Sequence, residues 1–201
     1  LGVTLVAVFW GMLIALALGL VWAICRRSKS PVLSWPAAGF VEFVRSTPLL
    51  VQIFFLFYVF PSLELTLSPL LTGVIALGLH YSCYTSEVYR AGINAVPPGQ
   101  WQAAKALNLS RWQTYRHVVL PQAIPPIIPA LGNYLIAMFK DSPMLLAITV
   151  LEILNRAKIY GNENFRYLEP ITIVGCIFLV LSLLSGLLIT WLDQRLKLER
   201  A

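Results

Sequence analysis

Five apolar stretches of this chain each have about the length that a helix needs to cross a lipid bilayer. A helix rises about 1.5 Å per residue and the hydrocarbon core is about 30 Å thick, so a span takes about 20 mainly apolar residues. The sequence predicts spans at about residues 1–25, 40–60, 68–90, 122–139 and 170–192. The second of these carries Glu42 and Arg45 at its start, before a turn at Ser46-Thr47-Pro48. Residues 144–154 are apolar but too short to cross, which predicts a half-helix or re-entrant segment. We therefore predict an all-α integral membrane protein, with one transmembrane domain over residues 1–201.

The composition excludes most soluble classes. Hydrophobic residues make up 58% of the chain and charged residues only 12%, whereas soluble domains are about 25% charged. The three cysteines, Cys25, Cys83 and Cys176, lie in apolar runs without metal-ligand spacing and are predicted to be reduced packing residues. No basic stretch precedes the apolar run that starts at Leu1, so we expect a trimmed or partly ordered start and no signal peptide.

The basic residues predict the orientation in the membrane. The net charge is +6, from 15 Lys and Arg against 9 Asp and Glu. With the C-terminus inside, the cytoplasmic cations are Arg26, Arg27, Lys29, Arg45, Arg90, Lys105, Arg111, Arg116, Arg195, Lys197 and Arg200. Only Arg156, Lys158 and Arg166 fall outside, and Lys140 lies near the membrane. Because cytoplasmic loops collect Lys and Arg, we predict an outside N-terminus and a cytoplasmic C-terminus, and no nucleic-acid partner.

The largest cytoplasmic stretch is the loop of residues 91–121. Its middle follows Pro97-Pro98-Gly99 and is rich in Ala, which predicts a short helix. Trp101, Ala104 and Leu107 fall near one face of that helix. The pattern fits a helix on lipid headgroups and, since the Ala residues are small, a helix in the groove of a partner protein. Periodicity alone leaves both open.

This loop also has the spacing of a known motif. The residues are Gln102-Ala103-Ala104, Asn108 and Val118-Val119-Leu120-Pro121. They resemble the cytoplasmic E-A-A-x3-G-x9-I-x-L-P loop of bacterial ABC importer permeases, with Gln102, Asn108 and Val118 in place of Glu, Gly and Ile. Gln102 can only hydrogen-bond where the family has a carboxylate, whereas Asn108 tolerates the left-handed conformation of a helix-ending Gly.

The resemblance extends over nearly the whole chain. Residues 41–52 and 87–100 are similar to the second span and the loop approach of polar amino-acid permeases. Residues 79–93 and 134–140 look closest to permeases for ectoine and hydroxyectoine.

The resemblance implies a permease subunit of an ATP-driven importer in the bacterial inner membrane. Its implied partners are a second, non-identical permease, two ABC ATPase subunits inside and an external solute-binding protein. This chain has no G-x-x-x-x-G-K-[ST] phosphate loop, so ATP and Mg²⁺ would be bound by the ATPases, and no enzyme activity or cofactor is expected of it. The implied coupling residues are Trp101, Gln102, Ala103, Ala104, Leu107 and Asn108. They would move as a lever and switch the permease pair between inward-open and outward-open states.

Polar residues inside the spans are candidates for the solute site. His80, Tyr84 and Glu87 recur at i, i+4 and i+7 on the third span, and Asn133 and Lys140 at i and i+7 on the fourth. A zwitterion such as ectoine or a polar amino acid needs a cation for its carboxylate, which Lys140 could supply. It also needs an acceptor or aromatic face, which Tyr84 or Glu87 could supply.

A structural role for these residues stays open. Glu87 and Arg90 could form an ion pair, Lys140 and Asp141 could neutralise each other, and His80 could simply pack.

Two other function classes are weaker on the sequence. A secondary transporter driven by an ion gradient is disfavoured, because the chain has no internal inverted repeat. An intramembrane enzyme is disfavoured because His80 and His117 are the only histidines, so neither a metal site nor a catalytic group is predicted.

Overall fold

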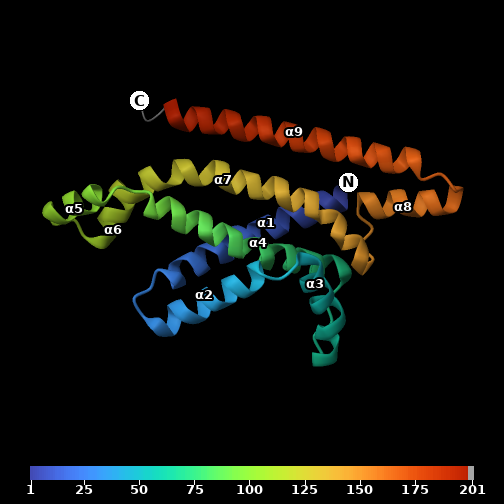
Figure 1. Cartoon of the computed structure of the whole chain (residues 1–201), viewed down its shortest axis with the longest axis horizontal. Helices are drawn as coiled ribbons and strands as arrows, with labels where there is room; N and C mark the ends of the chain where they lie inside the picture. Colours follow the sequence, from blue (N-terminus) through green and yellow to red (C-terminus); the bar gives the residue numbers. More distant parts are fainter. Residues whose placement is uncertain (199–201) are drawn as a thin grey trace.

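The computed structural model describes residues 1–198, with side chains for residues 1–195, and it is built of helices throughout that range (Figure 1). No strand occurs within the described residues, which confirms the predicted all-α class. The predicted cytoplasmic cations Lys197 and Arg200 lie outside the described side chains.

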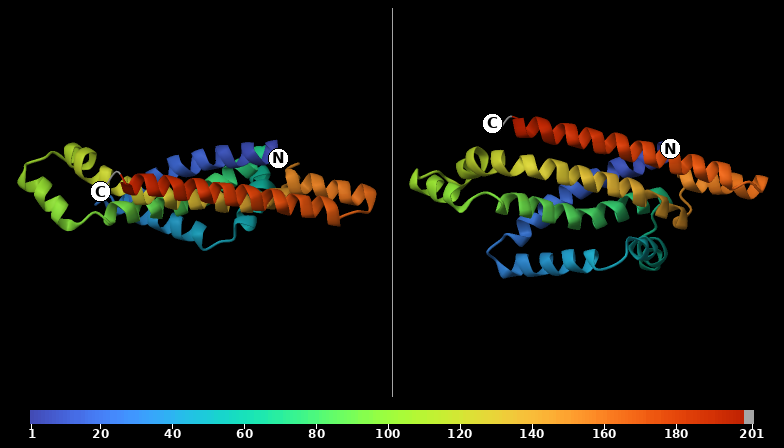
Figure 2. Two further views of the ribbon diagram at one scale, coloured as in Figure 1. Left: turned by 90° about the horizontal axis from the view of Figure 1, so that it is seen from above. Right: turned by 45° about the horizontal axis from the view of Figure 1, so that its top comes forward.

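The long helices lie side by side, and shorter elements connect them at their ends (Figures 1 and 2). The α-helices are α1 (Gly2–Arg26), α2 (Pro31–Arg45), α3 (Leu49–Phe54), α4 (Pro69–Asn94), α5 (Pro98–Ala106), α6 (Arg111–Gln113), α7 (Leu120–Asp141), α8 (Ile153–Asn164) and α9 (Leu168–Leu198). Two π-helical segments, η1 (Phe55–Val59) and η3 (Thr114–Val119), and two 3-10 segments, η2 (Phe60–Leu63) and η4 (Ser142–Ile148), complete the order.

Helices α1 and α4 form the centre and pack closely along their length. Lipid tails are as apolar as helix side chains, so burial of apolar surface contributes little to helix pairing in a bilayer. Close packing between small residues stabilises the pair instead. Gly11, Ala15 and Gly19 recur every four residues on α1 and are buried. A Cβ added to Gly19 would come within 2.9 Å of the Ser82 carbonyl oxygen of α4. Helix α7 packs on α4, and α9 packs on α7.

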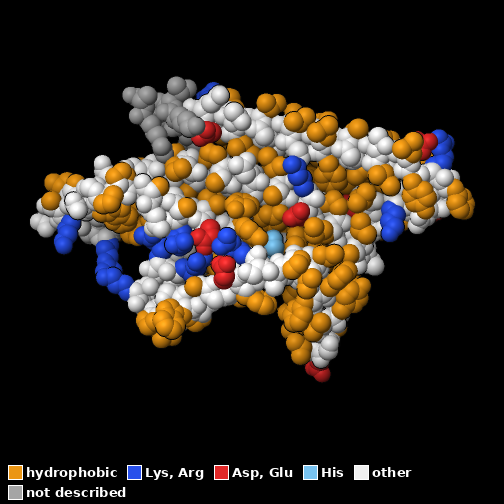
Figure 3. Space-filling model, in the orientation of Figure 1, with side chains coloured by type: hydrophobic (Ala, Val, Ile, Leu, Met, Phe, Trp, Pro, Cys, Tyr) orange, Lys and Arg blue, Asp and Glu red, His pale blue; other side chains and the backbone are white. Residues whose placement is uncertain are grey.

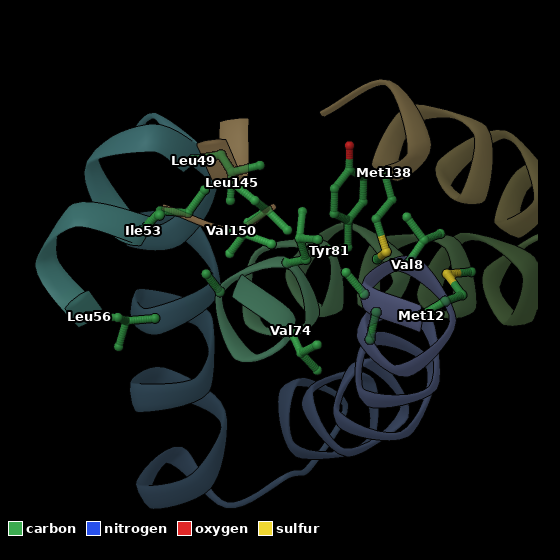
Figure 4. Close-up of a cluster of buried hydrophobic side chains, with 14 of the residues drawn as sticks. Val8, Met12, Leu49, Ile53, Leu56, Val74, Tyr81, Met138, Leu145 and Val150 are labelled. Carbon is green, nitrogen blue, oxygen red and sulfur yellow. The ribbon is translucent and has the colours of Figure 1, made fainter. Parts of the chain in front are cut away.

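The largest buried cluster joins four of the helices. Val8 of α1, Ile53 of α3, Val74 of α4 and Met138 of α7 are all less than a tenth exposed and converge there (Figure 4). This cluster fixes the lateral positions of the helices that bear the predicted solute residues.

Within the described residues, three helical segments are long and apolar enough to cross a membrane: Gly2–Arg26, Arg111–Ile148 and Leu168–Arg195. The bent pair Pro31–Arg45 and Leu49–Leu63 adds a fourth if it counts as one span. Helix α4 has 26 residues, about 39 Å at the usual rise, but its second half is polar. Its Ser82, Thr85 and Ser86 are fully buried, and their hydroxyls donate to backbone carbonyls. The count of five spans stays a prediction.

The span predicted at residues 40–60 consists of two helices that meet at the Ser46-Thr47-Pro48 turn. Helix α2 begins at Pro31 and ends at Arg45, and the chain bends by 105° before Leu49–Leu63. Pro48 has no N–H to continue the helix, so carbonyls of α2 lose their partners. Side chains replace those partners: Gln52 Nε2 donates to the Val44 carbonyl at 2.8 Å, and Thr47 Oγ1 donates to that of Phe43 at 3.1 Å.

The half-helix or re-entrant segment predicted at residues 144–154 is helical only as far as Ile148 and again from Ile153. Segment η4 ends at Ile148, and Thr149 takes a left-handed conformation with φ of 65°. Glu152 then caps α8, a 12-residue helix that the sequence reading had not predicted. Helix α8 contains polar residues such as Asn162 and Glu163, so apolar length did not predict it.

Candidate functional site

Four aromatic rings stack together where α4 faces α7. His80, Tyr81 and Tyr84 lie on one side of α4, and Tyr134 of α7 meets them; we call these four the aromatic group. Ring centroids are 5.1 Å apart for His80 and Tyr84, 5.5 Å for Tyr84 and Tyr134, and 6.2 Å for Tyr81 and Tyr134. These are ordinary distances for paired rings, so each ring orients its neighbours.

Polar and charged groups from three helices hold the edges of the aromatic group. Tyr81 Oη donates to Asp141 of α7 at 2.7 Å. His80 Nδ1 lies 3.1 Å from Gln52 Oε1 of α3. The Arg45 guanidinium of α2 lies 5.4 Å from the centre of the Tyr84 ring, within range of a cation–π contact. A cation and a carboxylate therefore contact different rings of the same group.

Next to the aromatic group, one carboxylate is surrounded by arginines. Glu87 pairs with Arg26 of α1, with Arg90 at 2.9 Å, and with Arg45 at 3.9 Å. The alternative in which Glu87 pairs with Arg90 is thus confirmed. Figure 3 shows these mixed charges on an otherwise largely apolar face. Arg45 is about a third exposed and also pairs with the exposed Glu42 at 3.6 Å, and both of its ion pairs are longer than a hydrogen bond.

The other predicted solute residues lie apart from this group. Asn133 and Lys140 are both exposed on α7. No hydrogen bond or ion pair within the described part of the chain joins either of them to the aromatic group, and Lys140 forms no pair with Asp141 there.

Sequence reasoning missed Arg45, Gln52, Tyr81, Tyr134 and Asp141. One signal was available, because Tyr134 and Asp141 are spaced i and i+7 and so share a helix face, as His80 and Glu87 do. The described residues contain no group of three or more His, Cys, Asp or Glu that could hold a metal ion.

The predicted helix of the cytoplasmic loop is present as α5, at one end of the molecule (Figure 2). Trp101 is half-buried, with its ring 5.6 Å from that of Tyr115 in η3. Gln102 and Ala103 are exposed, and Leu107 is 73% exposed. Asn108 has φ of 51°, which confirms the left-handed conformation expected there.

One feature of α5 corrects the sequence reading. Ala104 is only 2% exposed, because α5 packs with this side against η3. The idea that small Ala residues allow a partner to approach therefore applies to Ala103 and not to Ala104.

Known proteins match the chain over most of its length. The family described as "Binding-protein-dependent transport system inner membrane component" matches residues 15–198. The "Probable amino-acid ABC transporter permease protein y4tG" of Sinorhizobium fredii is 49% identical over 96% of this chain and 84% of its own length. The "L-cystine transport system permease protein TcyB" of Bacillus subtilis is 36% identical over 95% and 82%.

Solved structures agree with these matches. A crystal structure of an amino acid ABC transporter with histidines has a TM-score of 0.93 and 34% identity, and covers 97% of this chain and 91% of its own. The inward-facing methionine ABC transporter MetNI has a TM-score of 0.71 at 18% identity, covers 95% and 91%, and shares the fold.

Proposed function

The chain belongs to the family of binding-protein-dependent transport system inner membrane components, and we propose that it moves a zwitterionic amino acid into the cell as the transmembrane subunit of an ATP-driven importer. A second, non-identical permease completes the path, two ABC ATPase subunits bind inside and hold ATP and Mg²⁺, and an external binding protein delivers the solute. The observation that carries the proposal is that one unbroken helix, α4, bears three of the four rings of the aromatic group and leads directly into the exposed helix α5.

Helix α5 is the proposed contact with the ATPase. Gln102, Ala103 and Leu107 form its exposed surface, while Trp101 and Ala104 attach it to η3. The left-handed conformation of Asn108 follows the end of α5 and stops it from continuing. A force on α5 would therefore reach α4 and α7 together. That transmission suits alternating access, in which the permease pair opens in turn to each side.

The proposed orientation has the N-terminus outside and the C-terminus in the cytoplasm of a bacterium. Helix α5 then lies in the cytoplasm, as contact with an ATPase requires. The cations near it, such as Arg27 and Lys105, agree with the excess of basic residues found on cytoplasmic sides.

The aromatic group is the proposed solute site. The carboxylate of an amino acid would bind Arg45, whose distances of 3.6 Å from Glu42 and 3.9 Å from Glu87 leave it able to take a closer anion. The ammonium would lie over the rings of Tyr84 and Tyr134, on the side where Tyr81 contacts Asp141. Glu87, engaged by Arg26 and Arg90, would position Arg45 and not contact the solute.

Asn133 and Lys140 remain predicted contacts for a solute held between two permeases, since both are exposed on α7.

Uptake into proteoliposomes tests the proposal. The chain is reconstituted with its partner permease, ATPase and binding protein, and ATP-dependent uptake of a labelled amino acid is measured. Loss of one ring contact to a cation weakens binding by about 1–2 kcal/mol. Tyr84→Ala should therefore reduce uptake at low solute concentration by about tenfold, while Tyr160→Ala, at an exposed tyrosine of α8, should not.

Three results would contradict parts of the proposal. Uptake that persists without the ATPase would exclude the ABC mechanism in favour of an ion gradient. Normal uptake by Tyr84→Ala would move the solute site elsewhere. Competition by excess ectoine, with none by any amino acid, would replace the amino acid by a compatible solute.

A further inference from the structure

A concave site lies outside the helix bundle, between the α1–α2 turn and the region of α5 and η3. It encloses about 680 Å³, a volume typical of sites for small ligands. Its lining residues are Arg27, Ser28, Lys29, Ser30, Trp101, Lys105, Leu109, Arg111, Thr114 and Tyr115, which we call the basic pocket.

The basic pocket has cations without counter-charges. Four of its lining residues are basic and none is acidic. Arg27 donates to the Asn94 side chain, and Lys29, Lys105 and Arg111 form no ion pair in the part of the chain that the structure describes. Like charges gathered in one concavity repel each other and attract an anion.

The chemistry of the lining favours a phosphate. Lys29, Lys105 and Arg111 offer charged N–H donors, which form the strongest hydrogen bonds to phosphate oxygens. Ser28, Ser30 and Thr114 add hydroxyls to the lining. The rings of Trp101 and Tyr115 supply an apolar wall beside these donors.

The length of α1 indicates where one wall of the basic pocket, the α1–α2 turn, lies relative to a bilayer. Helix α1 has 25 residues, about 37 Å, whereas the hydrocarbon core is about 30 Å thick. The turn that follows Arg26 therefore lies beyond the acyl chains. Just after it, Val32 and Trp35 at the start of α2 are each 78% exposed. Exposed tryptophans are enriched where helices meet the membrane surface.

We propose that the basic pocket binds the phosphate of an anionic phospholipid headgroup, with the acyl chains of that lipid against the exposed start of α2. A free phosphate would use the cations but not the apolar surface of Val32 and Trp35. A lipid bound in this way contacts both the α1–α2 turn and α5, since Lys29 lines one side of the pocket and Lys105 the other.

Lipid binding to the purified full-length chain tests this proposal without any transport partner. The chain in neutral detergent is titrated with phosphatidylglycerol or with phosphatidylcholine of the same acyl chains, and bound lipids are counted by native mass spectrometry. Each cation near an anionic lipid strengthens binding by roughly fivefold. Combined Lys29→Gln, Lys105→Gln and Arg111→Gln should therefore weaken phosphatidylglycerol binding by about 100-fold.

The matched control removes three cations elsewhere. Arg116, Arg156 and Lys158 are exposed and lie outside the basic pocket, so their combined change to Gln should leave binding within twofold of the unaltered chain. The single variant Lys29→Gln, at an exposed residue of the turn, should weaken binding by about fivefold and keeps the test valid if the triple variant misfolds.

Several outcomes would overturn the proposal. Equal binding of the two lipids, or unchanged binding by Lys29→Gln and the triple variant, would exclude an anionic lipid. Displacement of phosphatidylglycerol by millimolar inorganic phosphate would identify a free-anion site. Normal lipid binding by the triple variant, with lost association of the ATPase subunit, would assign the basic pocket to an acidic protein surface.

Discussion

Glu87 is the residue whose loss should loosen the ends of three helices at once. Its carboxylate pairs with Arg26 from α1, Arg45 from α2 and Arg90 from its own helix α4. The change Glu87→Gln keeps the size of the side chain but removes the carboxylate that pairs with all three guanidinium groups.

The structure sets the size of this effect. The side chain of Glu87 is 24% exposed and that of Arg26 is 16% exposed. Exposed ion pairs contribute about 0–1 kcal/mol, whereas removing one partner of a buried pair costs about 3–5 kcal/mol. Since these groups lie between the two limits, we expect Glu87→Gln to lower the free energy of unfolding by about 2 kcal/mol.

Glu42 provides a matched control. Its side chain is 66% exposed, and its one ion pair is with Arg45 at 3.6 Å. Glu42→Gln removes the same charge from the same region and should cost less than about 0.5 kcal/mol. Unfolding of the full chain in mixed micelles, followed by far-UV circular dichroism against denaturant, compares the two variants.

A double-mutant cycle makes this test specific. If Arg26 and Glu87 interact as the structure shows, Arg26→Gln and Glu87→Gln should couple by about 1 kcal/mol or more. Equal stability of Glu87→Gln and Glu42→Gln, together with a coupling near zero, would refute a stabilising role for the cluster.

Two further predictions concern other parts of the chain. Ala103→Glu, at an exposed position of α5, should leave membrane insertion intact but uncouple ATP hydrolysis from uptake. Ala104→Glu, at a buried position of the same helix, should destabilise the fold. If both changes had the same effect on stability and on ATPase stimulation, α5 would not expose Ala103 while burying Ala104. Glu152 lies in the turn before α8, where burial raises its pKa above the usual 4.5 although the Leu154 and Asn155 amides donate to it. The carboxyl of Glu152 therefore keeps its proton to a higher pH in the folded chain than in the unfolded chain, and stability should fall as pH rises from about 4.5 through the folded pKa. Glu152→Gln should lack this part of the pH dependence when the midpoints of unfolding are compared from pH 4 to 8.

Apolar length predicted the long helices well, because a membrane span is set by one physical dimension. The span predicted at residues 1–25 is α1 (Gly2–Arg26), and that predicted at 122–139 lies within α7 (Leu120–Asp141). The short helix within residues 91–121 was also predictable, since Pro97-Pro98-Gly99 gives it a defined start and Asn108 a defined end.

The aromatic group was only partly predictable. Helical spacing placed His80 and Tyr84 on one face of α4 without the structure. The contacts to Tyr134 and Asp141 depend on which face of α7 meets α4, and apolar length contains no information on that rotation. The prediction for Asn133 and Lys140 had the same weakness, and both are exposed on α7.

The break between α2 and α3 lies where the candidate site is assembled. Pro48 has no amide N–H and so cannot donate to the Val44 carbonyl, as the residue four positions on does in a continuous helix. Thr47 Oγ1 and Gln52 Nε2 donate to that carbonyl instead, and Gln52 Oε1 contacts His80. Gln52 thus joins the broken end of α2 to the aromatic group, and Arg45, the last residue of α2, lies over Tyr84 from the same break. The helix break is therefore what brings a cation and an amide to the rings of α4.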